Sequence, residues 1–385
     1  MSDPAYSSSG SAAPRAATRL SSCIAPRLSA GNRLLLALPR LLALPCLLAL
    51  SACGESSTEN VGGAGGSGGS AGAAGSGGTA GVAEVLSTTE ASIGPVAADI
   101  GEEDTVCIFK RMSNPAGFVR NIRGHLTDGS HHMIVYLSGE TEEQLEPQHC
   151  GGFSGIFNLD GGIPGLDSVD IPVFIAQQHE AQVNLPSDPE TGKPLGFRVE
   201  ENQMVRIELH WFNTTPKSQQ VTGTVEFDIA GQEQDVIESS FAFWGTTAID
   251  IAPHSQFTTP VLFQRALTDT KGFAVTTHQH QLGTNMKIWK ADGTTVSDDK
   301  LLVESTDWAE PPLKILDPPE FFDVGEGLAY QCSWDNTSDQ NVGFGEGFGD
   351  EMCFLWMYYY PSNGFDLCMH FNKGAQNGVC NHLTR

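Results

Sequence analysis

The sequence predicts an all-β protein in which two antiparallel β-sandwich domains follow an export signal and a flexible linker. Strict alternation of apolar and polar residues, as in Met204 to Phe212, is typical of half-buried strands. Turn signals such as Asp128-Gly129 separate these runs, and no segment keeps a helical apolar period. The chain has 385 residues, 40% of them hydrophobic, which suits about two domains with real cores.

Three alternating runs are predicted strands: 204–212, 224–229 and 273–281. A polar stretch at 232–239 separates the strand-rich body into two similar lengths. We therefore expect an N-terminal sandwich over 84–235 and a C-terminal sandwich over 236–385.

Residues 1–53 have the pattern of an export signal. A basic region precedes the apolar run Leu41 to Leu50, which Pro45 interrupts and which is too short for a membrane span of about 20 residues. The run ends in Leu-Ser-Ala-Cys, which resembles a bacterial lipobox with Cys53 as the lipidated residue. We expect an exported, periplasmic or cell-surface lipoprotein that is anchored to the membrane only through Cys53. A plain cleavable signal is the alternative.

The segment 54–83 is predicted to be a linker rich in Gly, Ser and Ala. Twelve residues between Gly54 and Gly81 are glycine, which accounts for much of the total of 43. Such a composition cannot form a core and behaves as a flexible coil.

The charge balance excludes nucleic acid as a partner. Lys and Arg number 21 against 46 Asp and Glu, and the formal net charge is −25. A phosphate backbone requires clustered cations, so this acidic chain would repel it.

The cysteines indicate an oxidising compartment. Of the nine, Cys23, Cys46 and Cys53 lie in the export region. The even number that remains predicts up to three disulfides, with the pairing left open by these counts. These residues are Cys107, Cys150, Cys332, Cys353, Cys368 and Cys380.

Two histidine segments in the first half are candidate metal ligands. His131 and His132 open an apolar run, and adjacent histidines on a regular strand face opposite sides. Both could bind one ion only at a strand end or a bulge. His210 lies on the alternating run 204–212, on the face of Arg206 and Glu208. Each segment alone also fits a surface histidine.

Two further segments lie in the second half. His278 and His280 at spacing i, i+2 share one face of a strand, as a two-histidine metal clamp requires. Met352 precedes Cys353 and an aromatic run, where a core methionine is the plainer interpretation.

Taken together, the four segments favour copper. Imidazole suits several transition metals, whereas a thioether ligand selects copper, particularly Cu(I). A zinc-protease HExxH is absent, because His179-Glu180 lacks the second histidine. At Ser154 the nucleophile elbow GxSxG is incomplete, because Gly152-Phe153-Ser154-Gly155 is followed by Ile156.

In this order the four segments resemble the copper type II, ascorbate-dependent monooxygenases, the family of peptidylglycine α-hydroxylating and dopamine β-monooxygenases. The resemblance covers most of 102–361. It implies two jelly-roll domains and two copper ions, with ascorbate or a similar reductant and O2 as co-substrates.

The resemblance also implies the ligands and their roles. His131, His132 and His210 would hold an electron-storing copper, and His278, His280 and Met352 the copper where dioxygen binds and the substrate C–H bond is broken. It implies the disulfides Cys107–Cys150 and Cys332–Cys353. Cys368–Cys380 is then left as a C-terminal pair that the family does not predict.

The sequence departs from the peptide-hydroxylating branch where that branch binds a peptide carboxylate. Thr276, Phe354 and Trp356 stand where the branch has Arg, Asn and Tyr. A carboxylate would enter this apolar pocket unpaired, at a cost of several kcal/mol. We therefore expect a small neutral or cationic apolar substrate, such as an aryl-alkyl compound, hydroxylated at an aliphatic or benzylic C–H bond.

Two other functions remain open at this point. A non-catalytic exported copper-binding protein, for storage or delivery, would keep the same ligands. A tethered sandwich that binds glycan or another surface partner would carry the histidines incidentally.

Overall fold

The computed structural model describes residues 84–150, 170–266, 268–372 and 377–383. Their regular structure is β-strand apart from one short 3-10 helix, η2 (Asp298–Lys300). The all-β prediction is therefore confirmed. The predicted signal peptide, the lipidation site Cys53 and the linker lie outside these residues.

Nowhere in the described ranges does a helix reach the length and apolar character that a bilayer crossing requires.

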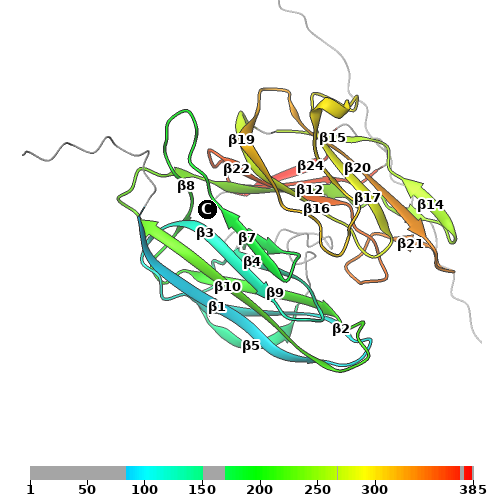
Figure 1. Ribbon diagram of the computed structural model, residues 1–385, viewed down its shortest axis with the longest axis horizontal. Coiled ribbons are helices and arrows are strands. Elements are labelled where there is room, and N and C mark those ends of the chain that lie inside the picture. The colour runs from blue at the N-terminus through cyan, green and yellow to red at the C-terminus, as the bar shows by residue number, and fades with distance from the viewer. Residues whose placement is uncertain (1–83, 151–169, 267, 373–376, 384–385) are drawn as a thin grey trace, which may run out of the picture. The chain divides into compact units, whose positions relative to one another are not determined.

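Two sheets form the first half of the described chain, residues 84–238 (Figure 1). The six-stranded sheet has the order β1-β10-β3-β8-β11, with β7 also paired to β3. Its strands are β1 (Val85–Ala98), β3 (Gly117–Leu126), β7 (Glu180–Asn184), β8 (Leu195–Val199), β10 (Gln219–Gly231) and β11 (Ile237–Glu238). The five-stranded sheet β5-β2-β9-β4-β6 comprises β2 (Glu103–Arg111), β4 (Ser130–Leu137), β5 (Gln144–His149), β6 (Ile171–Ala176) and β9 (Met204–Phe212).

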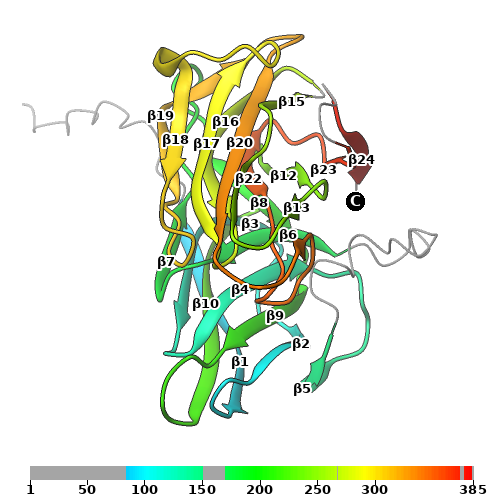
Figure 2. The same ribbon diagram turned by 90° about the vertical axis from the view of Figure 1, so that its right-hand side faces the viewer.

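Three sheets form the second half, residues 240–383 (Figure 2). The six-stranded sheet β19-β16-β22-β12-β23-β24 comprises β12 (Ser240–Thr246), β16 (Thr270–His278), β19 (Lys314–Phe322), β22 (Phe354–Tyr360), β23 (Phe365–His370) and β24 (Val379–Leu383). The five-stranded sheet contains β14 (Ser255–Thr258), β15 (Leu262–Arg265), β17 (Gly283–Ala291), β18 (Leu301–Ser305) and β20 (Gly327–Asn336). A short pair joins β13 (Asp250–Ile251) to β21 (Val342–Gly343).

No ladder among the described residues joins the strands of the first half to those of the second. The chain passes from one set of sheets to the other between Glu238 and Ser240. The described residues of both halves nevertheless belong to one compact unit by their contacts. The jelly-roll winding and the predicted boundary at 235/236 stay predictions.

Alternation places the strands as the sequence indicates. β9 has the predicted bounds, and Val205, Ile207, Leu209 and Trp211 are buried on one face. The opposite face is buried as well, since Arg206, Glu208 and His210 are at most 8% exposed. An exposed strand histidine is thus the wrong interpretation of His210.

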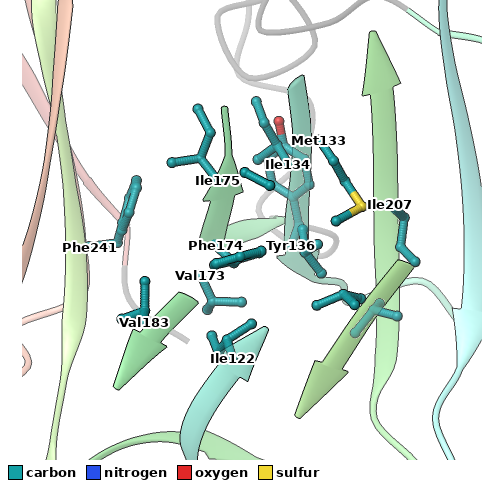
Figure 3. Close-up of a cluster of buried hydrophobic side chains, with 14 of the residues drawn as sticks. Ile122, Met133, Ile134, Tyr136, Val173, Phe174, Ile175, Val183, Ile207 and Phe241 are labelled. Carbon is teal, nitrogen blue, oxygen red and sulfur yellow. The ribbon is translucent and has the colours of Figure 1, made fainter. Parts of the chain in front are cut away.

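The strand β22 is buried on both faces, which explains its unbroken apolar run. Leu355 and Met357 pack into the core of the second half, whereas Phe354, Trp356 and Tyr358 join the core that continues into the first half. Figure 3 shows this continuity: Phe241 of β12, in the second half, lies in the same cluster as Val183 and Ile175 of the first half. The two halves therefore share a hydrophobic core.

Three disulfides are formed: Cys107–Cys150, Cys332–Cys353 and Cys368–Cys380. The first joins β2 to the residue after β5, and the second joins β20 to the residue before β22. The third links directly opposed residues of β23 and β24. These are the pairs expected from the family resemblance plus the additional C-terminal pair.

A buried carboxylate fastens the first half to the second. Asp188 Oδ1 accepts hydrogen bonds from Lys271 Nζ and the Tyr360 hydroxyl, both at 2.9 Å. Its other oxygen, Oδ2, accepts from Thr191. Burial raises the pKa of Asp188, but the bonds from Lys271, Thr191 and Tyr360 lower this pKa overall to about 2.

We predict that Asp188→Asn destabilises the protein in a pH-dependent way. The folded-state pKa lies below the unfolded value, so the carboxylate stabilises the fold above about pH 4 and loses this effect toward pH 2. The expected loss near pH 6 is about 1–2 kcal/mol in the free energy of unfolding. Urea titrations at several pH values measure it.

The matched control is Asp235→Asn, which removes an exposed ion pair with Lys193. Such pairs contribute about 0–1 kcal/mol. A difference between wild type and Asp188→Asn that does not shrink as the pH falls from 4 to 2 would contradict the prediction.

Candidate metal centre

His131 and His132 lie at the start of β4, after a turn in which Gly129 has φ +89°. The β4–β9 register shifts between Ser130 and His132, so His131 lies at an irregularity, and His132 is paired with His210. This is the bulge that two neighbouring histidines need in order to face one ion. The ring centroids of His131 and His132 lie 5.0 Å apart.

His278 and His280 are brought together differently from the expectation. The strand β16 ends at His278. His280 lies in the turn that follows, which is closed by a hydrogen bond from the Gly283 N–H to the His280 carbonyl. Their ring centroids are 5.3 Å apart. The two imidazoles therefore meet across a strand end and do not share one face of a continuous strand.

The five histidines form a single cluster. The ligand nitrogens of His131, His132 and His210 lie within 4.8 Å of one another, and so do those of His131, His278 and His280. His131 belongs to both groups. The two predicted histidine sets are thus adjacent in this structure, with the rings of His132 and His278 centred 5.4 Å apart.

Burial keeps most of these imidazoles neutral. Desolvation, assisted by the neighbouring histidines, lowers the pKa of His131, His132 and His278 well below its usual value. The same causes lower the pKa of His280 to about 4. Neutral imidazole is the form that binds a metal ion.

Protein acceptors orient three of the rings. His210 Nε2 donates to Glu103 Oε1 at 3.1 Å, and His278 Nδ1 donates to Gln177 Oε1 at 2.6 Å. His280 Nδ1 donates to the carbonyl oxygen of Asp350 at 3.0 Å. Each bond fixes the tautomer and leaves the other ring nitrogen with a lone pair for a metal.

Glu351 joins the His280 turn to the methionine segment. Its Oε2 accepts from the backbone N–H of His280 (3.0 Å), from that of Met352 (3.3 Å) and from Trp334 Nε1 (2.7 Å). Its Oε1 accepts from Leu282 N–H at 2.7 Å. Burial raises the pKa of Glu351 to about 7, although these donors act to lower it.

Met352 follows this glutamate directly. Its side chain is 2% exposed and belongs to the core cluster that also contains Phe354 and Trp356. The strand β22 starts at Phe354, so Met352 lies just before the strand.

The residues present fit a transition metal. His131 Nε2 and His280 Nε2 are buried and have no hydrogen-bond partner among the described residues. A buried polar atom without a partner is costly, and a metal ion would satisfy it. A donor set of neutral imidazoles suits copper among the transition metals.

A cavity of about 200 Å³ lies beside the cluster. His131, Gln177, Phe212, Trp308, Glu310 and Phe348 are among the residues that line it. The Trp308 ring centroid is 5.9 Å from that of His131, and Phe348 packs between Trp308 and Phe212 at 5.6 and 4.1 Å.

The residues expected to form the substrate pocket lie elsewhere. Phe354 and Trp356 are fully buried and pack on Phe243. Thr276 lines a separate cavity with Pro311, Pro312 and Leu313. An apolar run buried on both faces of a sheet has the same sequence pattern as a pocket wall, which explains the difference.

Sequence reasoning missed several residues that contact the cluster: Glu103, Gln177, Trp308, Phe348 and Glu351. Only Glu351 carried a signal, because it adjoins Met352. The others come from strands and loops whose proximity depends on how the sheets pack.

One comparison with known proteins matches most of the second half. Residues 251–377 match the family model described as copper type II ascorbate-dependent monooxygenase, C-terminal domain. No curated protein matches the chain. The match includes His278, His280 and Met352.

Solved structures of infectious bursal disease virus, strains Gt and Gx, align at 10% identity each. They cover 73% and 77% of this chain and 75% and 68% of their own, with TM-scores of 0.11 and 0.10. Scores this low carry no argument about the fold. The family-model match is the comparison that carries weight: residues 251–377 match the C-terminal domain of the copper type II ascorbate-dependent monooxygenases.

Proposed function

We propose that the protein is a copper-dependent monooxygenase that hydroxylates an aliphatic or benzylic C–H bond of a small substrate. One oxygen atom of O2 enters the substrate and the other leaves as water, with two electrons from ascorbate or a similar reductant and two protons. The observation that carries the proposal is the pair of three-histidine groups that share His131, in a chain whose 251–377 segment belongs to this family.

His131, His132 and His210 would hold one copper, and His278, His280 and Met352 the other. Copper supplies reversible one-electron chemistry and the activation of O2. Three imidazoles support both oxidation states, whereas a thioether favours Cu(I). Burial keeps the imidazoles of His131, His132, His278 and His280 neutral. Protein acceptors orient the rings of His210, His278 and His280.

Glu351 supports Met352 as the third ligand of the second copper. One carboxylate oxygen accepts from the amides of both His280 and Met352. The two backbones are therefore held side by side without a ladder between them. A buried carboxylate with four donors is a well-satisfied anchor, and such support is what precise metal geometry requires.

The aromatic cavity supports a neutral or cationic apolar substrate. Trp308, Phe348 and Phe212 supply its apolar walls, Glu310 contributes a carboxylate, and its described lining contains neither Lys nor Arg. A substrate carboxylate would find no cation there, whereas an aromatic or ammonium group would be accommodated.

We also propose that the protein works outside the cytoplasm, tethered through a lipid on Cys53. The three disulfides support an oxidising compartment. The acidic composition supports a small-molecule substrate over nucleic acid.

The deciding experiment uses the full exported chain. Metal analysis counts copper per chain, and an oxygen electrode follows ascorbate-driven O2 uptake with amines, aryl-alkyl compounds and glycine-extended peptides. We expect about two coppers and uptake that depends on an aryl-alkyl substrate. Two coppers without substrate-dependent uptake would favour a storage or delivery protein, and no copper would overturn the proposal.

We predict that His131→Ala lowers copper loading more than His132→Ala does. Both residues would be ligands of the first copper, so each variant should lose that ion. His131 also lies within 4.8 Å of the ligand nitrogens of His278 and His280. Its removal should therefore weaken the second site as well, whereas His132→Ala should keep about one copper per chain at limiting copper. Equal loading of the two variants would show that His131 affects the first site only.

We predict that Met352→Leu abolishes turnover while the three-histidine site still binds copper. Leucine conserves volume, so packing should cost less than about 1.5 kcal/mol. X-ray absorption of the Cu(I) protein should lose its copper–sulfur signal. The same change at Met286, a core methionine of the second half, is the control. Retained turnover in Met352→Leu would contradict the assigned role.

A further inference from the structure

Glu103 is the acidic residue that contacts both halves at the metal centre. It opens β2, and its Oε1 accepts from His210 Nε2 at 3.1 Å and from the Phe348 backbone N–H at 2.5 Å. His210 belongs to the first half and Phe348 to the second. We propose that Glu103 is a positioning residue that couples copper binding at His131, His132 and His210 to the loop 344–352.

Strand register places Glu103 against His210. In the antiparallel pair of β2 and β9, Glu103 lies opposite Phe212 and Thr105 lies opposite His210. Glu103 and His210 are therefore diagonal neighbours on one face of the sheet, within reach of long side chains. The ladder thus sets the alignment of the two residues, and the Glu103 side chain, 29% exposed, reaches the buried ring of His210 from the rim of the cluster.

The bond to Glu103 selects the state of His210. A carboxylate that accepts from Nε2 keeps the proton there, so that Nδ1 carries the lone pair. Carboxylates that bond the far nitrogen of a ligand histidine fix its orientation and raise its basicity. Copper at the first site thus binds best when Glu103 is in place.

The bond to Phe348 holds the loop that serves the second site. The Phe348 ring packs on Phe212, and its carbonyl accepts from Gln281 Nε2 at 3.0 Å. Two residues later, the Asp350 carbonyl orients His280, and Glu351 then bonds the amides of His280 and Met352. Anchoring Phe348 therefore constrains the loop that positions the second set of ligands.

Both donors converge on the same oxygen of Glu103, which gives the coupling its mechanism. Copper at the first site fixes His210, and a fixed His210 holds Oε1 where it accepts from Phe348. The effect is reciprocal, because an ordered loop favours the copper-binding orientation of His210. The copper part of this inference rests on the proposed function, whereas the anchoring of the loop does not.

Hydrogen–deuterium exchange of the full chain tests the coupling, read on peptides that cover 344–352 with and without Cu(I). In the wild type, copper should slow exchange of this loop. In Glu103→Ala the loop should exchange about tenfold faster without copper, the size expected for a lost bond to a charged acceptor, and copper should no longer slow it. Copper affinity at the first site should fall about 10–100-fold.

Two variants sharpen the test. Glu103→Gln keeps a carbonyl oxygen that can accept from both donors, so it should retain loop protection while losing the charge. Asp104→Asn is the matched control, because Asp104 is the next residue of β2 and pairs with the exposed His149, outside the cluster. It should behave as the wild type does.

Each failure has its own signature. Unchanged loop exchange in Glu103→Ala would overturn the anchoring. The coupling would be overturned, and the proposed function left standing, by the following pair of results. The loop exchanges faster in Glu103→Ala, but in the wild type its exchange rate is the same with and without bound copper. Metal analysis that finds no copper on the wild type would overturn both the coupling and the proposed function.

Discussion

The packing of five imidazoles at the junction of the two halves, four of them buried and His131 partly so, is the constraint on which the site depends. A buried ring nitrogen without a partner is costly, and the proposed copper would satisfy such nitrogens as His131 Nε2 and His280 Nε2. Glu103, Gln177 and the Asp350 carbonyl each take one nitrogen. The other nitrogen of each of these rings is then available to the proposed copper. The fold would thus determine which nitrogens can bind the metal.

The same constraint accounts for two irregularities in the sheets. A regular strand would send His131 and His132 to opposite faces, and the register shift after Ser130 brings their rings together. A strand that continued past His278 would engage the amides of His280 and Leu282 in a ladder, whereas here they donate to Glu351. The departures from regular pairing thus occur where ligands must converge.

Local patterns predicted the strand-rich class, three individual strands and all five histidines, because alternation and spacing are properties of one segment. The alternation of β9 showed which residues share a face, and both faces proved to be buried. What covers a face is decided by another segment, which explains why Glu103, Gln177 and Phe348 escaped prediction. Phe354 and Trp356 illustrate the converse, since their apolar run also fits a strand in a core shared by two halves.

The junction is held at several places. Asp188 bonds Lys271 and Tyr360, Glu103 bonds Phe348, and the core that includes Phe241 continues from one half into the other. Separating the halves would expose this core to water and would deprive the buried Asp188 carboxylate of its bonds from Lys271 and Tyr360. The cost would be several kcal/mol. Substrate should therefore reach the histidines through the cavity lined by Trp308 and Phe348, with the halves together. If the proposed function holds, selectivity depends on the aromatic side chains of Trp308, Phe348 and Phe212 that line this cavity beside His131.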